Sequence, residues 1–204
     1  MQFDKTYIQL LKEYTHHEGD QILRLLETKY RNRRIIFTKG EFVSRSWKQH
    51  SLEPGDDHYP ENYPKNYPYI CYKPVGTWYA LGEEWAKWLS SDMPEWWNRY
   101  DRIYMIDLDY SNILRLNTIQ KMRKFESEYS ASGNFEGYGL VKGIDWSKVK
   151  QHYKGIEIIP YQWNMRADSR NQWYHSWDVG SGCVWSASAI KGVREIVPEL
   201  SRND

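Results

Sequence analysis

The sequence has little of what marks secreted, metal-binding or membrane-spanning proteins. Its two cysteines, Cys71 and Cys183, are too few for a disulfide framework and lack zinc-type spacing, so we expect a reducing cytoplasm and no structural metal. No apolar run approaches the roughly eighteen residues of a membrane span, so no membrane partner is expected. The N-terminal residues carry acids and no apolar core, which argues against a signal peptide.

The chain also has almost no net charge and lacks the common nucleotide-binding and nucleophile-elbow motifs. Lys+Arg 28 against Asp+Glu 27 leaves a net charge of +1, so a polyanionic partner would have to bind a local patch. No GxGxxG, GxxxxGK[ST] or GxSxG motif occurs, which leaves Rossmann, P-loop and nucleophile-elbow interpretations without support. Cys183 has apolar neighbours and is expected to be a buried, inert thiol rather than a nucleophile.

Aromatic residues are abundant instead, with 11 Trp and 17 Tyr. Residues 72–88 concentrate them and predict a strand that turns directly into a helix at Gly82. Trp85 and Trp88 fall on one helical face, which is expected to hold the helix against the core. A hydrophobic corner without a binding role is the alternative for this stretch.

The rest of the chain predicts one α+β domain over residues 1–204, with N-terminal helices in residues 1–30. Further helices are predicted at residues 119–129, 145–153 and 190–200. Strands are predicted at residues 35–38, 102–109, 113–117, 155–161 and 173–185, and loops at 47–71, 130–143 and 166–170. Gly19 is expected to break the first helical region before an N-cap at Asp20, and Gly155 to end a helix in the left-handed conformation.

Two carboxylates stand out in apolar surroundings. Glu157 lies inside an apolar strand, where a charge is costly unless it is paired or used. A strand with one solvated face is the alternative. Asp178 lies between Trp177 and Val179, where an Asx-type hydrogen bond at a glycine bend is the alternative to a functional role.

A series of motifs runs from about residue 34 to about residue 190. It comprises Lys73-Pro74-x-Gly76-x-Trp78, Trp85 and Trp88, Leu108-Asp109, Ile113-Leu114-Arg115-Leu116, Ile144-Asp145-Trp146, Tyr153-x-Gly155-Ile156-Glu157-Ile158, Pro160-Tyr161 and Trp177-Asp178-Val179-x-Ser181-Gly182-Cys183-Val184-Trp185. Together these motifs resemble a bacterial and phage group that shares the ADP-ribosyltransferase-like fold. The resemblance implies a split mixed/antiparallel sheet with flanking helices, preceded by an N-terminal helical segment.

That resemblance implies an NAD-dependent enzyme in which NAD is the co-substrate. Glu157 corresponds to the catalytic Glu of a late strand. A fixed carboxylate there suits the chemistry, because cleavage of the nicotinamide–ribose bond builds an oxocarbenium-like cation. The expected NAD-binding residues are Arg34, Thr38, Lys73, Gly76, Trp78 and Tyr79. Arg34 or Thr38 would anchor NAD where similar proteins carry a His or Arg, and Gly76 would permit close backbone approach to the nicotinamide amide.

The acceptor is expected to be a macromolecule, with nucleic acid (RNA or DNA) favoured over protein. Aromatic and basic side chains mixed on loops suit stacking on unpaired bases, and Arg166, Arg170, Trp173 and Asp178 are the predicted acceptor-binding residues. Such an enzyme would act in a bacterial cytoplasm as a toxin or phage-encoded effector, with an antitoxin or host protein as a further partner. An inactive binding module of the same fold is the alternative, and an RNA 2′-phosphotransferase is a third hypothesis.

Overall fold

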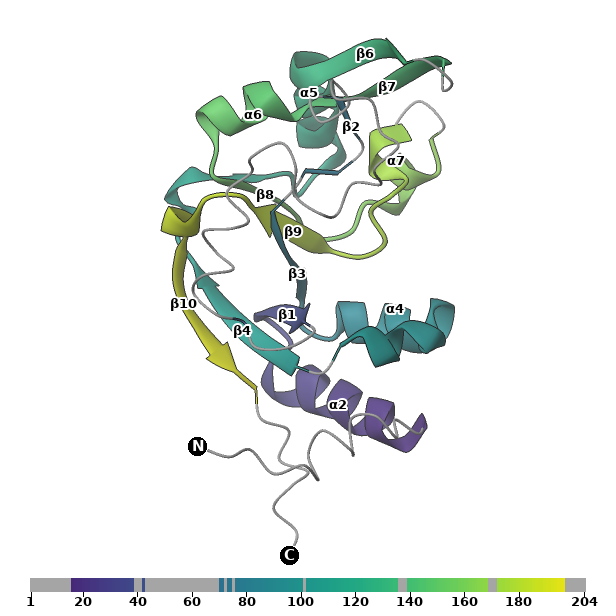
Figure 1. The fold of residues 1–204 in the computed structure, drawn as a ribbon, viewed down its shortest axis with the longest axis vertical. Helices are drawn as coiled ribbons and strands as arrows, with labels where there is room; N and C mark the ends of the chain where they lie inside the picture. The colour runs from purple at the N-terminus through teal and green to yellow at the C-terminus, as the bar shows by residue number, and fades with distance from the viewer. Residues whose placement is uncertain are drawn as a thin grey trace, which may run out of the picture. The chain divides into compact units, whose positions relative to one another are not determined.

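The computed structural model describes residues 16–38, 42, 70–71, 73–74, 76–100, 102–135, 139–168 and 172–196. These residues form a mixed α+β protein, as the sequence predicts (Figure 1). Of the helices in these ranges, none has the length and apolar character needed to cross a membrane. The chain makes two compact units: unit 1 is residues 1–43, 79–107 and 191–204, and unit 2 is residues 44–78 and 108–190. The prediction of one domain stays a prediction.

Unit 1 packs helices against antiparallel strands. Its elements are α2 (His16–Lys29), β1 (Arg34–Thr38), most of β3 (Thr77–Leu81), α4 (Glu84–Asp92), the 3-10 helix η2 (Pro94–Arg99), β4 (Arg102–Leu108) and β10 (Ile190–Glu195). The strand order is β10-β4-β1-β3, and β1 is antiparallel to both β3 and β4. Helices α2 and α4 lie side by side in Figure 1 and contribute Leu26 and Leu89 to the same core.

The predicted strand-to-helix corner is present in unit 1. Gly82 follows β3 with φ at +52°, and a Cβ on it would lie 2.5 Å from the Arg31 carbonyl oxygen, so only glycine fits. The rings of Trp85 and Trp88 stack at 4.7 Å and pack against the core of unit 1. The expectation that these two tryptophans hold the helix to the core is confirmed.

Unit 2 contains strands of two sheets and the second core. Its elements are β2 (Ile70–Cys71), η3 (Tyr110–Asn112), β5 (Ile113–Arg115), α5 (Ile119–Tyr129), β6 (Ser130–Phe135), β7 (Gly139–Asp145), α6 (Trp146–His152), β8 (Gly155–Ile158), α7 (Trp163–Arg166), η4 (Gln172–Tyr174), β9 (Ser181–Val184) and η5 (Ala187–Ala189). Strand β8 runs parallel to β5 and antiparallel to β9. The other sheet has the order β2-β7-β6 and is antiparallel.

Helix caps in unit 2 follow the sequence closely. The Thr118 hydroxyl accepts a hydrogen bond from the Lys121 amide at 3.3 Å, and the Asp145 carboxylate accepts one from the Lys148 amide at 3.2 Å. Both side chains satisfy amides that have no partner within the helix. The predicted starts of α5 and α6 are therefore confirmed.

Other local predictions are wrong where pairing with distant segments decides the structure. Residues 130–143, predicted as a loop from their glycines, form the β6–β7 ladder apart from residues 136–138, which lie outside the described ranges. Residues 190–195, predicted as the start of a helix, form β10, which lies next to β4 in the sheet. Ladder hydrogen bonds outweigh local propensity in both segments.

The expected roles of two glycines are also wrong. Gly155 is the first residue of β8, not a left-handed cap, and a Cβ there would lie 2.7 Å from a methyl carbon of Val184. Gly19 lies inside α2, not at a break, and Asp20 is helical rather than an N-cap. Residues 1–15 of the predicted N-terminal helices and residues 47–69 of the predicted loop lie outside the described residues.

Candidate functional site

Glu157, the predicted catalytic residue, is buried within unit 2. All four residues of β8 are buried, and Glu157 has a side chain that is 1% exposed. The parallel pairing of β5 with β8 places Arg115 directly beside it. Arg115 Nε lies 3.3 Å from one carboxylate oxygen of Glu157, and the Tyr110 hydroxyl donates to the other oxygen at 3.3 Å. The alternative of a solvated strand face is wrong, because this carboxylate is buried and paired.

The partners of Glu157 form a small shell around it. The Arg115 guanidinium lies 5.2 Å from the centre of the Tyr110 ring, and the Arg115 side chain is 51% exposed. The ion pair thus has one buried member and one member at the surface. Because the Glu157 side chain is only 1% exposed, a ribose hydroxyl can reach the carboxylate only if neighbouring groups move aside.

A second carboxylate, Asp178, gathers residues from two other segments of unit 2. Lys73 Nζ lies 3.6 Å from one of its oxygens, and Arg166 Nη1 lies 3.5 Å from the other. The Asp178 side chain is 21% exposed, so a ligand can approach it far more easily than Glu157. Lys73 precedes β3 and Arg166 ends α7, so the chain must fold before these charges meet.

Arg166 is held by more than its ion pair. Its Nη1 donates to the Tyr161 hydroxyl at 2.9 Å and to the Trp177 carbonyl at 3.1 Å, and the Tyr161 hydroxyl donates to the same carbonyl. The Tyr161 hydroxyl raises the pKa of Arg166, and burial raises the pKa of Tyr161. Arg166 is therefore fixed in position and permanently charged.

Trp78 adds an aromatic wall to the same place. Lys73 Nζ lies 5.3 Å from the centre of the Trp78 ring, which meets Trp177 edge-on at 4.8 Å. Burial lowers the pKa of Lys73, and nearby Arg166 lowers it further, while Asp178 opposes both effects. We call Lys73, Trp78, Tyr161, Arg166 and Asp178 the Asp178 cluster. It unites two cations, a carboxylate and a half-buried indole.

The structure separates the other predicted site residues. Arg34 and Thr38 lie half-buried on β1 in unit 1, where Arg34 Nη1 donates to the Asn32 carbonyl at 3.1 Å. Tyr79 is 2% exposed in the core of unit 1, so its ring offers no free face for stacking in this structure. Trp173 is likewise 2% exposed, and Arg170 lies outside the described residues. The predictions of a Tyr79 nicotinamide wall and of a Trp173 acceptor contact thus conflict with burial.

Gly76 has a packing reason that the sequence did not reveal. A Cβ on Gly76 would lie 2.5 Å from the Val184 carbonyl oxygen and 2.8 Å from the sulfur of buried Cys183. Both atoms belong to β9 of the same unit. The approach of this strand by itself requires a glycine, so the glycine does not point to a ligand.

Gly76→Ala is expected to destabilise the protein by about 2 kcal/mol, because the new methyl group must displace strand backbone. Urea denaturation measures the change. Gly192→Ala on β10 is the matched control, since a Cβ there meets nothing within 4 Å, and we expect it to be neutral or slightly stabilising. Equal stability of the two variants would contradict this expectation and show that the backbone of β9 shifts to accommodate the methyl group at little cost in free energy.

Sequence reasoning missed three residues of these sites. Tyr110 and Arg115 were not identified as partners of Glu157, because the identity of its partner depends on the register of β5 against β8. Trp163, at the start of α7, is 68% exposed, and its ring meets Tyr161 edge-on at 4.7 Å. Its signal in the sequence was an aromatic residue two positions after Tyr161 of the Pro160-Tyr161 motif.

The described residues contain no group of three or more His, Cys, Asp or Glu side chains that could hold a metal ion. Comparison of the chain with protein-family models, with curated proteins and with solved structures finds no match. The candidate sites therefore stand on their own chemistry and on the motif resemblance.

Proposed function

We propose that this chain is an NAD-dependent ADP-ribosyltransferase that modifies a macromolecular acceptor, with nucleic acid preferred over protein. The observation that supports it most is the convergence of Lys73, Trp78, Arg166 and Asp178, four of the residues expected to bind NAD or the acceptor. The ADP-ribosyltransferase-like arrangement of the fold, with a split sheet, is part of this proposal.

The chemistry of the Asp178 cluster suits a dinucleotide. Lys73 and Arg166 supply cationic donors for a pyrophosphate, and Trp78 supplies an aromatic surface for a planar ring. In the reaction, the bond between nicotinamide and ribose breaks and nicotinamide leaves with the electron pair. A nucleophile of the acceptor attacks the ribosyl cation and loses its proton. A carboxylate near the cation stabilises it.

Two carboxylates compete for that role. The resemblance assigns it to Glu157, which is almost inaccessible and bound at both oxygens. Asp178 also faces a cation at each oxygen, but it is 21% exposed, and its partner Lys73 lies beside Trp78. We therefore propose that Asp178 faces the ribosyl cation, while Glu157 holds the β5–β8 pair together through Arg115.

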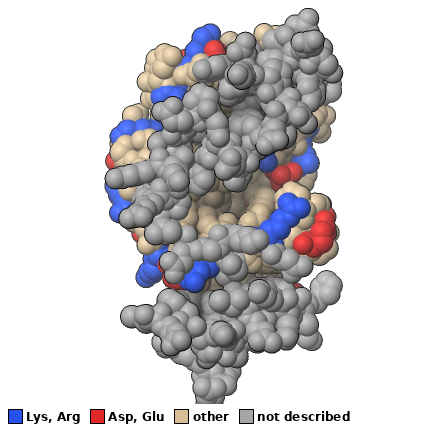
Figure 2. Space-filling view, viewed as in Figure 1, with Lys and Arg blue, Asp and Glu red and all other residues tan. Residues whose placement is uncertain are grey.

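Trp163 extends the site toward an acceptor. Its exposed ring contacts Tyr161, which also binds Arg166, so it lies at the rim of the Asp178 cluster. Among the described residues, Figure 2 shows basic and acidic side chains in small groups on the face in view, without a broad patch of one sign. Stacking of an unpaired base on Trp163 would supply affinity that this balanced surface does not.

The test is incubation of the protein with NAD labelled in its adenylate part, together with single-stranded RNA, single-stranded DNA or cell lysate. We expect nicotinamide release and label on a single-stranded oligonucleotide. Trp163→Ala is expected to lower label transfer about tenfold more than it lowers nicotinamide release, while Trp163→Phe retains transfer. Label on lysate protein alone would instead select a protein acceptor.

A binding module without catalysis is the second candidate, and the ion pairs at both carboxylates favour it. It predicts no nicotinamide release, no stabilisation by NAD, and oligonucleotide binding that weakens with salt. Trp163→Ala would weaken that binding as well, so nicotinamide release is the measurement that separates the two candidates.

A further inference from the structure

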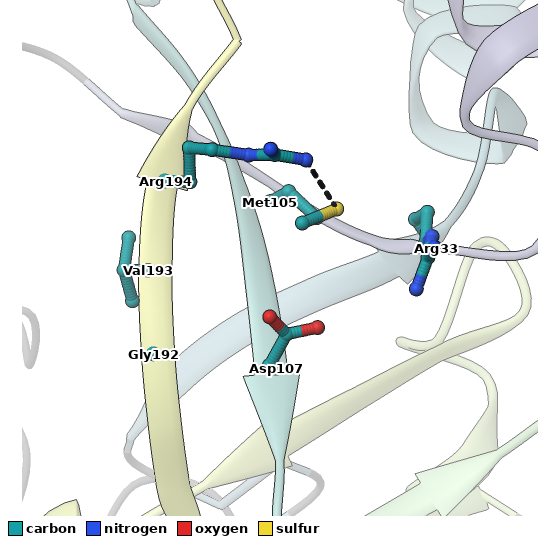
Figure 3. A pocket seen from close by; sticks show the side chains of 6 residues that line it. All are labelled: Arg33, Met105, Asp107, Gly192, Val193 and Arg194. Carbon is teal, nitrogen blue, oxygen red and sulfur yellow. Dashed lines mark hydrogen bonds between the residues drawn. The ribbon is translucent and has the colours of Figure 1, made fainter.

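Unit 1 contains a pocket that the proposed function does not use. Its volume is about 390 Å³, and it is lined by Arg33, Met105, Asp107, Gly192, Val193 and Arg194. Figure 3 shows β10 on one side and Arg33 on the other, with Met105 and Asp107 of β4 between them. The volume lies within the range of small-molecule sites.

The charged groups of this pocket are available to a ligand. The register of β1 against β4 pairs Arg34 with Ile106, and Arg33 and Asp107 are the next residues beyond this pair. Even so, these two side chains make no ion pair, and within the described ranges neither has a side-chain partner. Within the described ranges, the only hydrogen-bond acceptor of the Arg194 side chain is the Met105 sulfur, a weak acceptor, at 3.8 Å. Three charged groups thus line one pocket with their strong hydrogen-bonding capacity unused by the described residues.

The remaining lining leaves room and supplies an apolar surface. A Cβ on Gly192 would meet nothing within 4 Å, so the pocket is open above this strand. Met105 provides apolar contact beside the charges, whereas the Val193 side chain lies on the other side of β10 in Figure 3. A ligand for this site would combine an anionic group, hydrogen-bond donors and a small apolar part.

We propose that this pocket binds a small phosphomonoester, such as a sugar phosphate or a nucleoside monophosphate. Guanidinium groups match phosphate oxygens in geometry. Two guanidinium groups suit a ligand with a dianionic phosphate better than a ligand with a single, monoanionic carboxylate. Asp107 would accept hydrogen bonds from sugar hydroxyls. The two arginines and one aspartate of the lining leave one excess positive charge, which favours an anionic ligand. The Asp107 carboxylate favours a ligand that also carries hydrogen-bond donors.

The test is calorimetric titration of the full chain with AMP, ribose 5-phosphate, adenosine and inorganic phosphate. We expect the two phosphomonoesters to bind and adenosine to fail. Arg33→Gln or Arg194→Gln should weaken phosphomonoester binding about tenfold, which is the scale of one lost charge-assisted hydrogen bond. Asp107→Asn should weaken ribose 5-phosphate but not inorganic phosphate. Failure of both phosphomonoesters to bind overturns the proposal.

Location is tested by filling the pocket. Gly192→Phe should abolish phosphomonoester binding, whereas Gly192→Ala should retain it, because its methyl group meets no atom. Binding that survives Gly192→Phe, or that is unchanged in both arginine variants, overturns the assignment. Binding that is lost in Lys73→Gln but kept in Gly192→Phe would place the ligand in the Asp178 cluster instead. The outcome does not depend on NAD turnover.

Discussion

Arg115→Ala is expected to lower the free energy of unfolding by about 3 kcal/mol, because it leaves the Glu157 carboxylate buried without its cation. The pair is asymmetric: Glu157 is inaccessible, while half of the Arg115 side chain is exposed. An ordinary surface ion pair contributes about 0–1 kcal/mol. The measured loss of unfolding free energy therefore tells whether this ion pair behaves as a buried pair, as the environment of Glu157 predicts, or as a surface pair, as that of Arg115 predicts.

Urea denaturation of three further variants isolates the cause of this loss. Tyr110→Phe removes one hydrogen bond to Glu157 and should cost about 1 kcal/mol. Arg115→Met combined with Glu157→Met should recover most of the loss, since apolar groups replace both charges. A loss below about 1 kcal/mol in Arg115→Ala, with no recovery in the double variant, would contradict a buried-charge origin.

The stability of this pair also affects how activity data are interpreted. Glu157→Gln keeps the shape of the side chain but removes the charge that Arg115 faces. Loss of activity in that variant can therefore come from loosened β5–β8 packing. Activity must be compared at equal folded fraction, which the denaturation curves supply.

Local chemistry made part of the fold predictable. Thr118 and Asp145 begin their helices through their own side chains, and Gly82 ends a strand because its conformation excludes other residues. By contrast, β10 and the β6–β7 ladder depend on partners distant in sequence, which the local pattern does not contain. The mixed α+β class was accessible from the sequence, and the pairing that decides individual strands was not.

In the candidate site, too, the sequence identified individual residues but not the partners that the fold brings to them. An acid in an apolar strand marked Glu157 as paired or used, but naming Arg115 needed the register of β5 against β8. Lys73, Arg166 and Asp178 were each identified, yet as members of separate NAD and acceptor sites. Only the fold brings them within 4 Å as ion pairs. Trp163 was missed because the sequence does not tell an exposed tryptophan from a buried one.

Asp178→Asn is expected to lower nicotinamide release from NAD by about 100-fold or more, the scale of losing one preorganised charge at a developing ion. The substitution keeps the shape of the side chain and removes the negative charge that would face the ribosyl cation. Because Asp178 is partly exposed, the folded structure should survive, which circular dichroism and the thermal midpoint check. Lys73→Gln is expected to weaken NAD binding more than it slows the bound reaction, since a cation on the pyrophosphate acts before and during cleavage alike.

Glu157→Gln provides the decisive comparison for this prediction, measured at equal folded fraction. If Asp178→Asn loses cleavage and Glu157→Gln retains it, the open carboxylate of the Asp178 cluster is the catalytic one. If the result is reversed, Glu157 is the catalytic carboxylate. Groups that now cover it, such as Arg115 and Tyr110, would then have to move aside to admit the ribose, and a structure with bound NAD would show this movement. Cleavage that persists in both variants would exclude either carboxylate from the reaction. The difference in exposure between Asp178 and Glu157 favours the first outcome, because a group that stabilises a cation must first be able to reach it.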